Sequence, residues 1–250
     1  MASPEVRVIG LEGLPEVRPG DDVAAAIVAA GGSDPGIQPG DVVVVTQKIV
    51  SKAEGRLILL DDVTPSAEAE RLAQETAKDP RLVELVLRES TRIVRQREGV
   101  LIAETRHGFV CANAGVDSSN VGEGYVALLP EDPDRSAEAI RSGIKARTGA
   151  EVAVIISDTF GRPWREGHLN VAVGVAGMAP FADYVGRVDP HGYELRVSLL
   201  AVADELASAA ELVMGKLSQV PVAIVRGYVY PPGCGTARDM VRPPERDLFR

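Results

Sequence analysis

The sequence predicts an α+β protein built on mixed sheets. Three β-branched runs, at residues 42–46 (VVVVT), 152–157 (VAVIIS) and 222–226 (VAIVR), are apolar up to their last residue. Such runs are typical of strands that are covered on both faces. Helical segments lie between them without strict strand–helix alternation, which favours α+β over a doubly wound Rossmann sheet.

Five segments carry helical signals: 22–30, 66–78, 80–88, 136–148 and 199–214. Asp79 is placed to cap the third segment, since proline is tolerated at a first helical position such as Pro80. In the last segment the apolar residues fall at 3-4-3-4 spacing on one predicted face. They are Leu199, Val202, Leu206, Ala209 and Val213. Gly215 follows, where a helix end favours a left-handed residue.

Four shorter apolar runs predict further strands, at 57–60, 100–103, 109–112 and 126–129. The middle two are separated by residues 104–108 (ETRHG), which suits a hairpin connection.

Composition fixes the broad class of the protein. The 250 residues are 45% hydrophobic and 25% charged, which is typical of a folded soluble chain. We expect residues 1–250 to form a single catalytic unit, with two packed subdomains as the alternative. The formal charge of −9 argues against nucleic acid and anionic membranes as partners.

The chain ends and the cysteines indicate the compartment. The N-terminal residues MASPE lack a basic start and an apolar signal core, and no apolar run is long enough to cross a bilayer. Cys111 and Cys234 match no disulfide framework or zinc spacing and are interpreted as a small buried hydrophobe or a loop residue. These features predict a cytoplasmic protein.

Several common site motifs are absent from the sequence. It contains no G-x-x-x-x-G-K-[ST], so the standard P-loop is excluded. Residues 122–127 (GEGYVA) imitate a dinucleotide fingerprint, but no strand is predicted before them and Pro130 soon follows. His107, His168 and His191 show no metal-pair spacing.

The segment 115–122 (GVDSSNVG) is the first candidate site. Glycines bracket an acid, two hydroxyls and an amide, so a ligand can approach the backbone closely. Asp117 is suited to Mg²⁺ or Mn²⁺, and Asn120 offers both a donor and an acceptor. The alternative is an Asx-type turn between strands.

The second candidate is 157–167 (SDTFGRPWREG). Asp158 and Thr159 are predicted just past the carboxyl end of a buried strand, where α/β sheets place ligand sites. They would complete a metal site with Asp117. Arg162 and Arg165 would meet anionic groups, and Trp164 would stack on a ring. The alternative has Asp158 capping a turn and Trp164 filling a gap in the core.

Two weaker candidates remain. The Gly- and Pro-rich loop 10–22 can present backbone groups to a nucleotide, with Lys48 or Lys52 neutralising phosphate, although lysines after strands are usually solvated. Four arginines, Arg81, Arg88, Arg92 and Arg95, have the spacing of one helical face. Their default role is salt bridging with Glu84 and Glu89, and anion binding is the alternative.

These segments, in this order, resemble the family of coenzyme F-420 gamma-glutamyl ligases. The matching stretches are GLPEVRPGDD, VVVVTQKIVSKAEGR, ANAGVDSSNVGEG, LLPEDPDRSA, ISDTFGRPWREG, VAVGVAG, ADELASAAELVMGK and PVAIVRG, between Val8 and Phe249. In the two-domain actinobacterial form a nitroreductase-like domain follows this region. The resemblance therefore fits both a stand-alone member and a first domain.

The resemblance implies a reaction and a fold. Such ligases join L-glutamate to a deazaflavin precursor (F-420-0) with GTP, release GDP and phosphate, and add a further gamma-linked glutamate. Their fold is an α+β fold without a P-loop that forms an intertwined homodimer.

The resemblance also implies site residues. Asp117, Asp158 and Thr159 match divalent-metal positions for a pair of Mg²⁺ or Mn²⁺ ions, with K⁺ as a further candidate, and both aspartates would be catalytic. The guanine-nucleotide positions match Leu14, Pro15, Glu16, Val17, Gln47, Lys52, Asn120, Met214, Gly215 and Lys216.

The chemistry follows as a hypothesis. An amine does not attack a free carboxylate unless that carboxylate is first activated, most simply as an acyl phosphate. Metals on Asp117 and Asp158 would bridge the GTP phosphates, and Arg162, Trp164 and Arg165 would hold the precursor. Two alternatives stay open: another NTP-dependent carboxylate–amine ligase with a different acceptor, and a nucleotide-binding module without catalysis.

Overall fold

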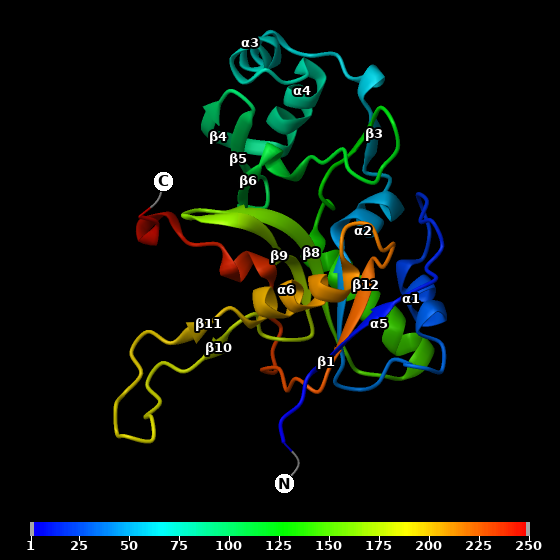
Figure 1. Cartoon of the computed structure of the whole chain (residues 1–250), viewed down its shortest axis with the longest axis vertical. Coiled ribbons are helices and arrows are strands. Elements are labelled where there is room, and N and C mark those ends of the chain that lie inside the picture. The colour runs from blue at the N-terminus through cyan, green and yellow to red at the C-terminus, as the bar shows by residue number, and fades with distance from the viewer. Residues whose placement is uncertain (1–2, 249–250) are drawn as a thin grey trace.

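The computed structural model describes residues 3–248 and is organised around a five-stranded mixed sheet (Figure 1). The strand order is β1 (Arg7–Leu11), β12 (Val222–Arg226), β2 (Val42–Thr46), β8 (Ala153–Arg162) and β9 (Arg165–Ala176). Only β2 and β8 run parallel within this sheet. The predicted α+β class with a mixed sheet is confirmed. Met1, Ala2, Phe249 and Arg250, the ends of the predicted 1–250 unit, lie outside the described residues.

The central strands are buried on both faces, as their β-branched runs predict. Val43 and Ile156 pack into one core, whereas their chain neighbours Val44 and Ile155 pack into the other. The first core is closed by α1 (Val23–Gly31), α2 (Gln47–Ala53) and α5 (Pro133–Thr148). The second is closed by α6 (Val202–Met214). Side chains that alternate between two apolar layers need no polar positions, which explains the unbroken runs.

A smaller lobe with its own core lies above this sheet in Figure 1. It contains α3 (Ala67–Thr76), α4 (Pro80–Glu89), β4 (Ser90–Arg97), β5 (Val100–Thr105) and β6 (Val110–Ala112). The antiparallel pair β3 (Leu57–Leu59) and β7 (Tyr125–Ala127) connects the lobe to the main sheet. The predicted hairpin around residues 104–108 is confirmed, since β5 and β6 pair antiparallel.

All five predicted helices are present, with ends displaced by up to three residues. Side-chain caps fix the first turns of four of them. Asp79 accepts a hydrogen bond from the Arg81 N–H at the start of α4, as predicted, and Asp132 accepts one from the Arg135 N–H at the start of α5. Each such cap satisfies a backbone donor that has no partner within its own helix.

The predicted helix 199–214 starts three residues too early, and its buried face is right only in part, since Val202 and Leu206 are buried whereas Ala209 and Val213 are half-buried. Leu199 and Leu200 form the short strand β11, which pairs with β10 (Ala182–Asp183), and Leu199 is 48% exposed. The helix begins at Val202 and buries alanines at positions 203, 207 and 210 together with Leu206 and Met214. Small residues on this face let the helix pack closely on the sheet, and the leucine-based periodicity did not show them.

The predicted helical face of four arginines is also wrong. Helix α4 ends at Glu89, so Arg92 and Arg95 belong to the strand β4. Three of the four form salt bridges, but only Arg88 does so with a predicted partner. Arg81 pairs with Asp79 and Asp61, Arg88 with Glu84, and Arg92 with Glu104.

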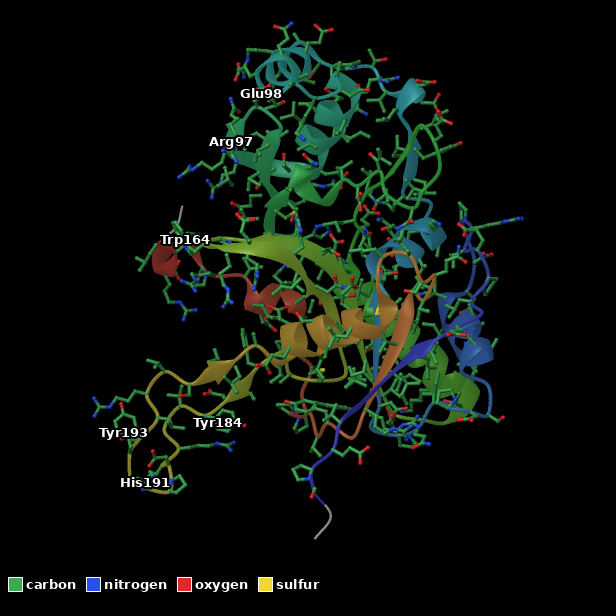
Figure 2. All side chains as sticks on the ribbon, viewed as in Figure 1. Arg97, Glu98, Trp164, Tyr184, His191 and Tyr193 are labelled. Atoms are coloured by element: carbon green, nitrogen blue, oxygen red, sulfur yellow. The ribbon has the colours of Figure 1, made fainter. Side chains whose placement is uncertain are left out.

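A long excursion between β9 and α6 leaves the body of the molecule (Figure 1). We call residues 182–200 the arm. It is held by backbone hydrogen bonds within itself, such as Gly186 N–H to Leu195 O and Leu195 N–H to Arg187 O. Tyr184, His191 and Tyr193 project from it (Figure 2). The sequence motifs do not account for this segment.

Two further expectations concern the described residues 3–248. Within them no helix is long and apolar enough to span a membrane. Cys111 is buried and Cys234 is exposed, and both are free thiols, as interpreted from the sequence. Burial raises the pKa of the Cys111 thiol to about 12, so it behaves as a hydrophobic side chain.

Candidate active site

A cleft opens at the end of the sheet where the parallel pairing of β2 with β8 stops, at Thr46 and Ser157. It has a volume of about 930 Å³, which is enough for a nucleotide-sized ligand. Its lining comprises residues 12–17, 46–49, 157–159 and 215–221 together with Lys52, Asp117, Asn120, Asn170 and Glu211. Carboxyl ends of parallel strands are the usual position of ligand sites in such sheets.

The loop after β1 forms one wall of the cleft. Gly13 has a φ of 77°, which lets the chain turn sharply as it leaves the strand. Val17 is buried and anchors the far end of the loop. The predicted nucleotide residues Leu14, Pro15, Glu16 and Val17 all line the cleft. The Glu16 Oε1 lies 2.5 Å from the Lys52 Nζ.

Helix α2 forms the floor next to this loop. It follows β2 without an intervening loop, so that Gln47, Lys48 and Lys52 all reach the cleft. Gln47 is only 1% exposed, and its Oε1 accepts a hydrogen bond from Ser51 Oγ at 2.8 Å. Its Nε2 is buried without a partner among the described residues. A buried donor without an acceptor is costly, so this amide is suited to a ligand oxygen.

Asp117 carries a fixed negative charge. Its Oδ2 lies 2.6 Å from Lys48 Nζ, and its carboxylate accepts hydrogen bonds from the N–H and Oγ of Ser119. Burial acts to raise the pKa of Asp117, but these hydrogen bonds and the Lys48 charge outweigh it and hold the pKa below its usual value. The hydrogen bond from the Ser119 N–H to Asp117 forms an Asx-type turn, which is the alternative that the sequence predicted for this segment. Asp117 also lines the cleft, so the turn and the position in the cleft occur together.

Asp158 lies opposite in the same cleft, and its environment differs. The sequence places it just past the end of a strand, which is wrong, because β8 continues to Arg162 as a ribbon paired with β9. No side-chain donor contacts its carboxylate within residues 3–248. Burial raises the pKa of Asp158 to about 6, and the nearby Asp117 charge adds to this increase. The Asp158 side chain is half-buried, and the charges of Lys48 and Lys216 offset this increase only in part.

The part of the chain that forms this cleft matches a known protein family. The profile of the F420-0:Gamma-glutamyl ligase family matches residues 13–227. The chain belongs to this family. The matched span of the F420-0:gamma-glutamyl ligase family contains every cleft residue except Glu12.

Curated relatives in the F420-0:gamma-glutamyl ligase family match over nearly their whole length. The coenzyme F420:L-glutamate ligase of Methanothermobacter thermautotrophicus is 50% identical over 251 residues, which cover 98% of this chain and 99% of that protein. The coenzyme F420:L-glutamate ligase of Methanopyrus kandleri is 48% identical, with 94% of each chain covered. That of Methanocaldococcus jannaschii is 45% identical, with 98% and 97% covered.

A polar network that the sequence motifs missed closes the cleft of this family member at the end of α6. Thr159 Oγ1 donates to Asn170 Oδ1 at 2.8 Å, and Asn170 Nδ2 donates to Glu211 Oε2 at 2.9 Å. Lys216 Nζ donates to Thr159 Oγ1 and lies 3.8 Å from Glu211 Oε1. Asn170 is the hub and is 2% exposed. Its one sequence signal is a lone amide inside the apolar run of β9.

Four predicted site residues do not line the cleft. Met214 is fully buried in the core beneath α6, and only its neighbours Gly215 and Lys216 reach the cleft. Arg162, Trp164 and Arg165 lie at the tip of the β8–β9 hairpin, where Trp164 is 87% exposed (Figure 2). A role for these three in holding a substrate stays a prediction.

The cleft residues fit a divalent metal ion that is completed by a ligand. Within residues 3–248 no group of three or more His, Cys, Asp or Glu side chains could hold a metal ion alone. Mg²⁺ and Mn²⁺ are commonly held by one or two carboxylates with phosphate oxygens and water as the other ligands. Asp158, a half-buried carboxylate that no side-chain donor contacts within residues 3–248, and Asp117 supply that donor set.

Proposed function

We propose that this protein is a GTP-dependent ligase that joins L-glutamate to the coenzyme F-420 precursor and then adds a gamma-linked glutamate. The observation that carries the proposal is the convergence of two aspartates and three lysines in one cleft. Supporting it, the relatives named coenzyme F420:L-glutamate ligase share 45–50% of their residues with the chain along nearly its whole length.

The nucleotide would bind between the 12–17 loop and α2. Lys48, Lys52 and Lys216 would neutralise its phosphates, which a chain of net charge −9 must do locally. The unpartnered Gln47 Nε2 would donate to a nucleotide oxygen, and Asn120 would offer a further polar contact. The backbone of Leu14, Pro15, Glu16 and Val17 would shape the remaining wall.

A divalent ion, Mg²⁺ or Mn²⁺, would be held by Asp158 and Asp117. When bound, such an ion supplies charge neutralisation to a transferring phosphoryl group. K⁺ remains a candidate as an additional cation. Bound there, the ion would add a positive charge next to the Asp158 carboxylate.

The proposed reaction has two steps, phosphoryl transfer and amide formation. The precursor carboxylate attacks the γ-phosphorus of GTP, so that an acyl phosphate forms and GDP leaves. The glutamate amine then attacks the acyl carbon, phosphate leaves, and the nitrogen loses a proton. The chain would contribute positioning and charge neutralisation through its lysines, since phosphoryl transfer depends chiefly on these. In a second round, the same two steps activate the side-chain carboxylate of the added glutamate and join it to the amine of another glutamate, which gives the gamma linkage.

The direct test is a turnover assay read by mass spectrometry. We expect the full chain with GTP, Mn²⁺, L-glutamate and the deazaflavin precursor to yield monoglutamyl and then diglutamyl products, with GDP and phosphate in equal amounts. Replacing GTP by ATP is the matched control for the base. Glutamylation of other acids but not of the precursor would indicate a ligase with a different acceptor. GDP binding without GTP consumption would indicate a binding module and contradict the proposal.

We also propose that the protein is a homodimer that assembles through the arm. The arm carries exposed apolar side chains on a segment that leaves the body, which is unusual for a monomer. They are Tyr184, Val185, Val188, Tyr193, Val197, Leu199 and Leu200. A second copy is the occupant we favour, because the resemblance implies an intertwined dimer and an extended segment of this length can embrace a neighbour.

The dimer proposal predicts the effect of charged substitutions on the arm. The side chains of Val197 and Leu199 are 88% and 48% exposed, and Leu199 pairs with Asp183 through its backbone, so Val197→Asp with Leu199→Lys should leave folding intact. We expect the apparent mass in light scattering to fall from that of a dimer to that of one chain. Leu212→Lys, at an exposed leucine on α6 outside the arm, is the control and should keep the dimer. A wild-type chain that is monomeric at micromolar concentration would contradict the assembly.

A further inference from the structure

Lys216 occupies a position that a metal ion would otherwise be expected to fill. The family resemblance implies a pair of divalent ions, with Thr159 as a ligand. In the structure the Thr159 hydroxyl already donates its one proton to Asn170 Oδ1 at 2.8 Å. Its lone pairs accept from Lys216 Nζ. The oxygen that would face a second cation therefore faces an ammonium group.

The Lys216 side chain is 61% exposed, and its ammonium has two polar neighbours, Thr159 and Glu211. Glu211 Oε1 lies 3.8 Å from Lys216 Nζ, and Glu211 Oε2 is engaged by Asn170 at 2.9 Å. Asn170 is almost fully buried, and its backbone oxygen accepts from Ser208 Oγ, so the network has a fixed frame. Gly215, with a φ of 56°, ends α6 and turns the chain so that Lys216 reaches back to Thr159.

A metal ion on Thr159 would conflict with this lysine. A ligand oxygen of Mg²⁺ or Mn²⁺ lies about 2.1 Å from the ion. An ammonium bonded to the same oxygen would then stand within roughly 4 Å of a doubly positive charge, and the two would repel each other. At the aspartate pair Lys48 Nζ engages Asp117 Oδ2, so an ion there would use Asp117 Oδ1, which accepts only an uncharged N–H from Ser119. No lysine contacts the Asp158 carboxylate within the described residues.

We propose that the Lys216 ammonium replaces the second divalent ion in this chain, so that the cleft takes one Mg²⁺ or Mn²⁺ per nucleotide. The ion binds at Asp158 and Asp117, and Lys216 neutralises the phosphate end from the Thr159 side. Lys216 is a positioning and charge-neutralising residue toward the nucleotide. This inference rests on the proposed function, because it requires both a nucleotide and a metal in the cleft.

The test counts bound Mn²⁺ with a readout that does not need turnover. The full chain with an equal amount of GDP is titrated with Mn²⁺, and the free ion is followed by its electron paramagnetic resonance signal, with GDP alone as the reference. We expect one tight Mn²⁺ per chain. Lys216→Gln removes the ammonium and offers an amide oxygen beside Thr159, so we expect two, with spectral broadening from the closely spaced pair.

Two controls separate the inference from the proposed function. Lys145→Gln, on the exposed face of α5 and paired with Glu151, should keep one ion. Lys216→Ala, with thermal melting to check folding, should also remove the block to a second ion, although that ion binds more weakly. Two tight ions in the unchanged chain, or one ion in both Lys216 variants, would overturn the inference alone. A chain that binds neither GDP nor Mn²⁺ would overturn the proposed function and this inference with it.

Discussion

The Asp158→Asn variant is expected to lose ligase turnover while its metal-free form becomes more stable near pH 7. Turnover should fall by about 10²–10³-fold, because the buried metal-facing carboxylate is removed and its amide replacement is a poor ligand for a hard cation. Stability should rise because burial raises the pKa of Asp158 to about 6. At neutral pH the folded chain thus carries an unfavourable buried charge, which asparagine lacks.

The raised pKa of Asp158 determines how the free energy of unfolding changes with pH. Below about pH 4 the carboxyl is protonated in both the folded and unfolded chains and costs nothing. Between about pH 4 and pH 6 the unfolded chain loses the proton first, so the free energy of unfolding falls as the pH rises. Above pH 6 the loss is complete and amounts to at most about 3 kcal/mol. Asp158→Asn should therefore gain stability over wild type at pH 7 and little at pH 4.

Thermal melting with and without Mn²⁺ checks both parts. In EDTA at pH 7 the melting temperature of Asp158→Asn should exceed that of wild type by about 5 °C. Mn²⁺ should raise the melting temperature of wild type and leave that of the variant unchanged. Asp204→Asn is the matched control, because burial also raises the pKa of Asp204, which lies in the first turn of α6, accepts a hydrogen bond from the Ala172 N–H and is outside the cleft. An Asp158→Asn chain that keeps turnover and the Mn²⁺ response would refute the metal assignment.

Asp158 lies at the boundary between what could and could not be predicted from the sequence. The cores of β2, β8 and β12 could be predicted because burial on both faces leaves unbroken apolar runs. The end of β8 could not. After Ser157 the strand leaves the two apolar layers and continues as a ribbon with β9, where polar residues are tolerated. Asp158 was therefore placed beyond a strand that in fact contains it.

Helix α2 and the polar network around Asn170 were not predicted from the sequence, and the reasons differ. Helix α2 has seven residues, too few for a helical period to show, so its lysines resemble loop residues. The network joins Thr159, Asn170 and Glu211 from three elements, and its members meet only when β9 pairs with β8 and α6 packs on them. Tertiary contacts of this kind leave no local pattern, whereas the glycine-bracketed Asp117 segment does.

Breaking the salt bridge between Asp41 and Arg226 is expected to cause the largest loss of stability of any single polar change away from the cleft. Asp41 is 1% exposed, and both of its oxygens accept from the Arg226 guanidinium at 2.8 Å. Its Oδ2 also accepts from the Gln38 N–H, and Arg226 donates to the Gly36 carbonyl. The pair thus joins the start of β2, the end of β12 and the loop before β2.

Removing one partner should cost far more than the pair itself is worth. Asp41→Ala leaves a mostly buried guanidinium without its counter-charge and the Gln38 N–H without an acceptor, so the free energy of unfolding should fall by about 3–5 kcal/mol. Asp41→Ala combined with Arg226→Met should lose less than the sum of the two single changes, because no unpaired charge remains. Urea denaturation of the three variants measures this coupling.

Arg71→Ala supplies the reference for an ion pair in water. Arg71 and Glu75 are 58% and 43% exposed on α3, so the loss there should stay within about 0.5 kcal/mol. Turnover per folded molecule should be unchanged in Asp41→Ala, because Asp41 precedes β2 at the end opposite Thr46 and the cleft. If Asp41→Ala costs no more than Arg71→Ala, water must reach the Asp41 carboxylate. The end of the sheet opposite the cleft would then be held by its apolar layers alone.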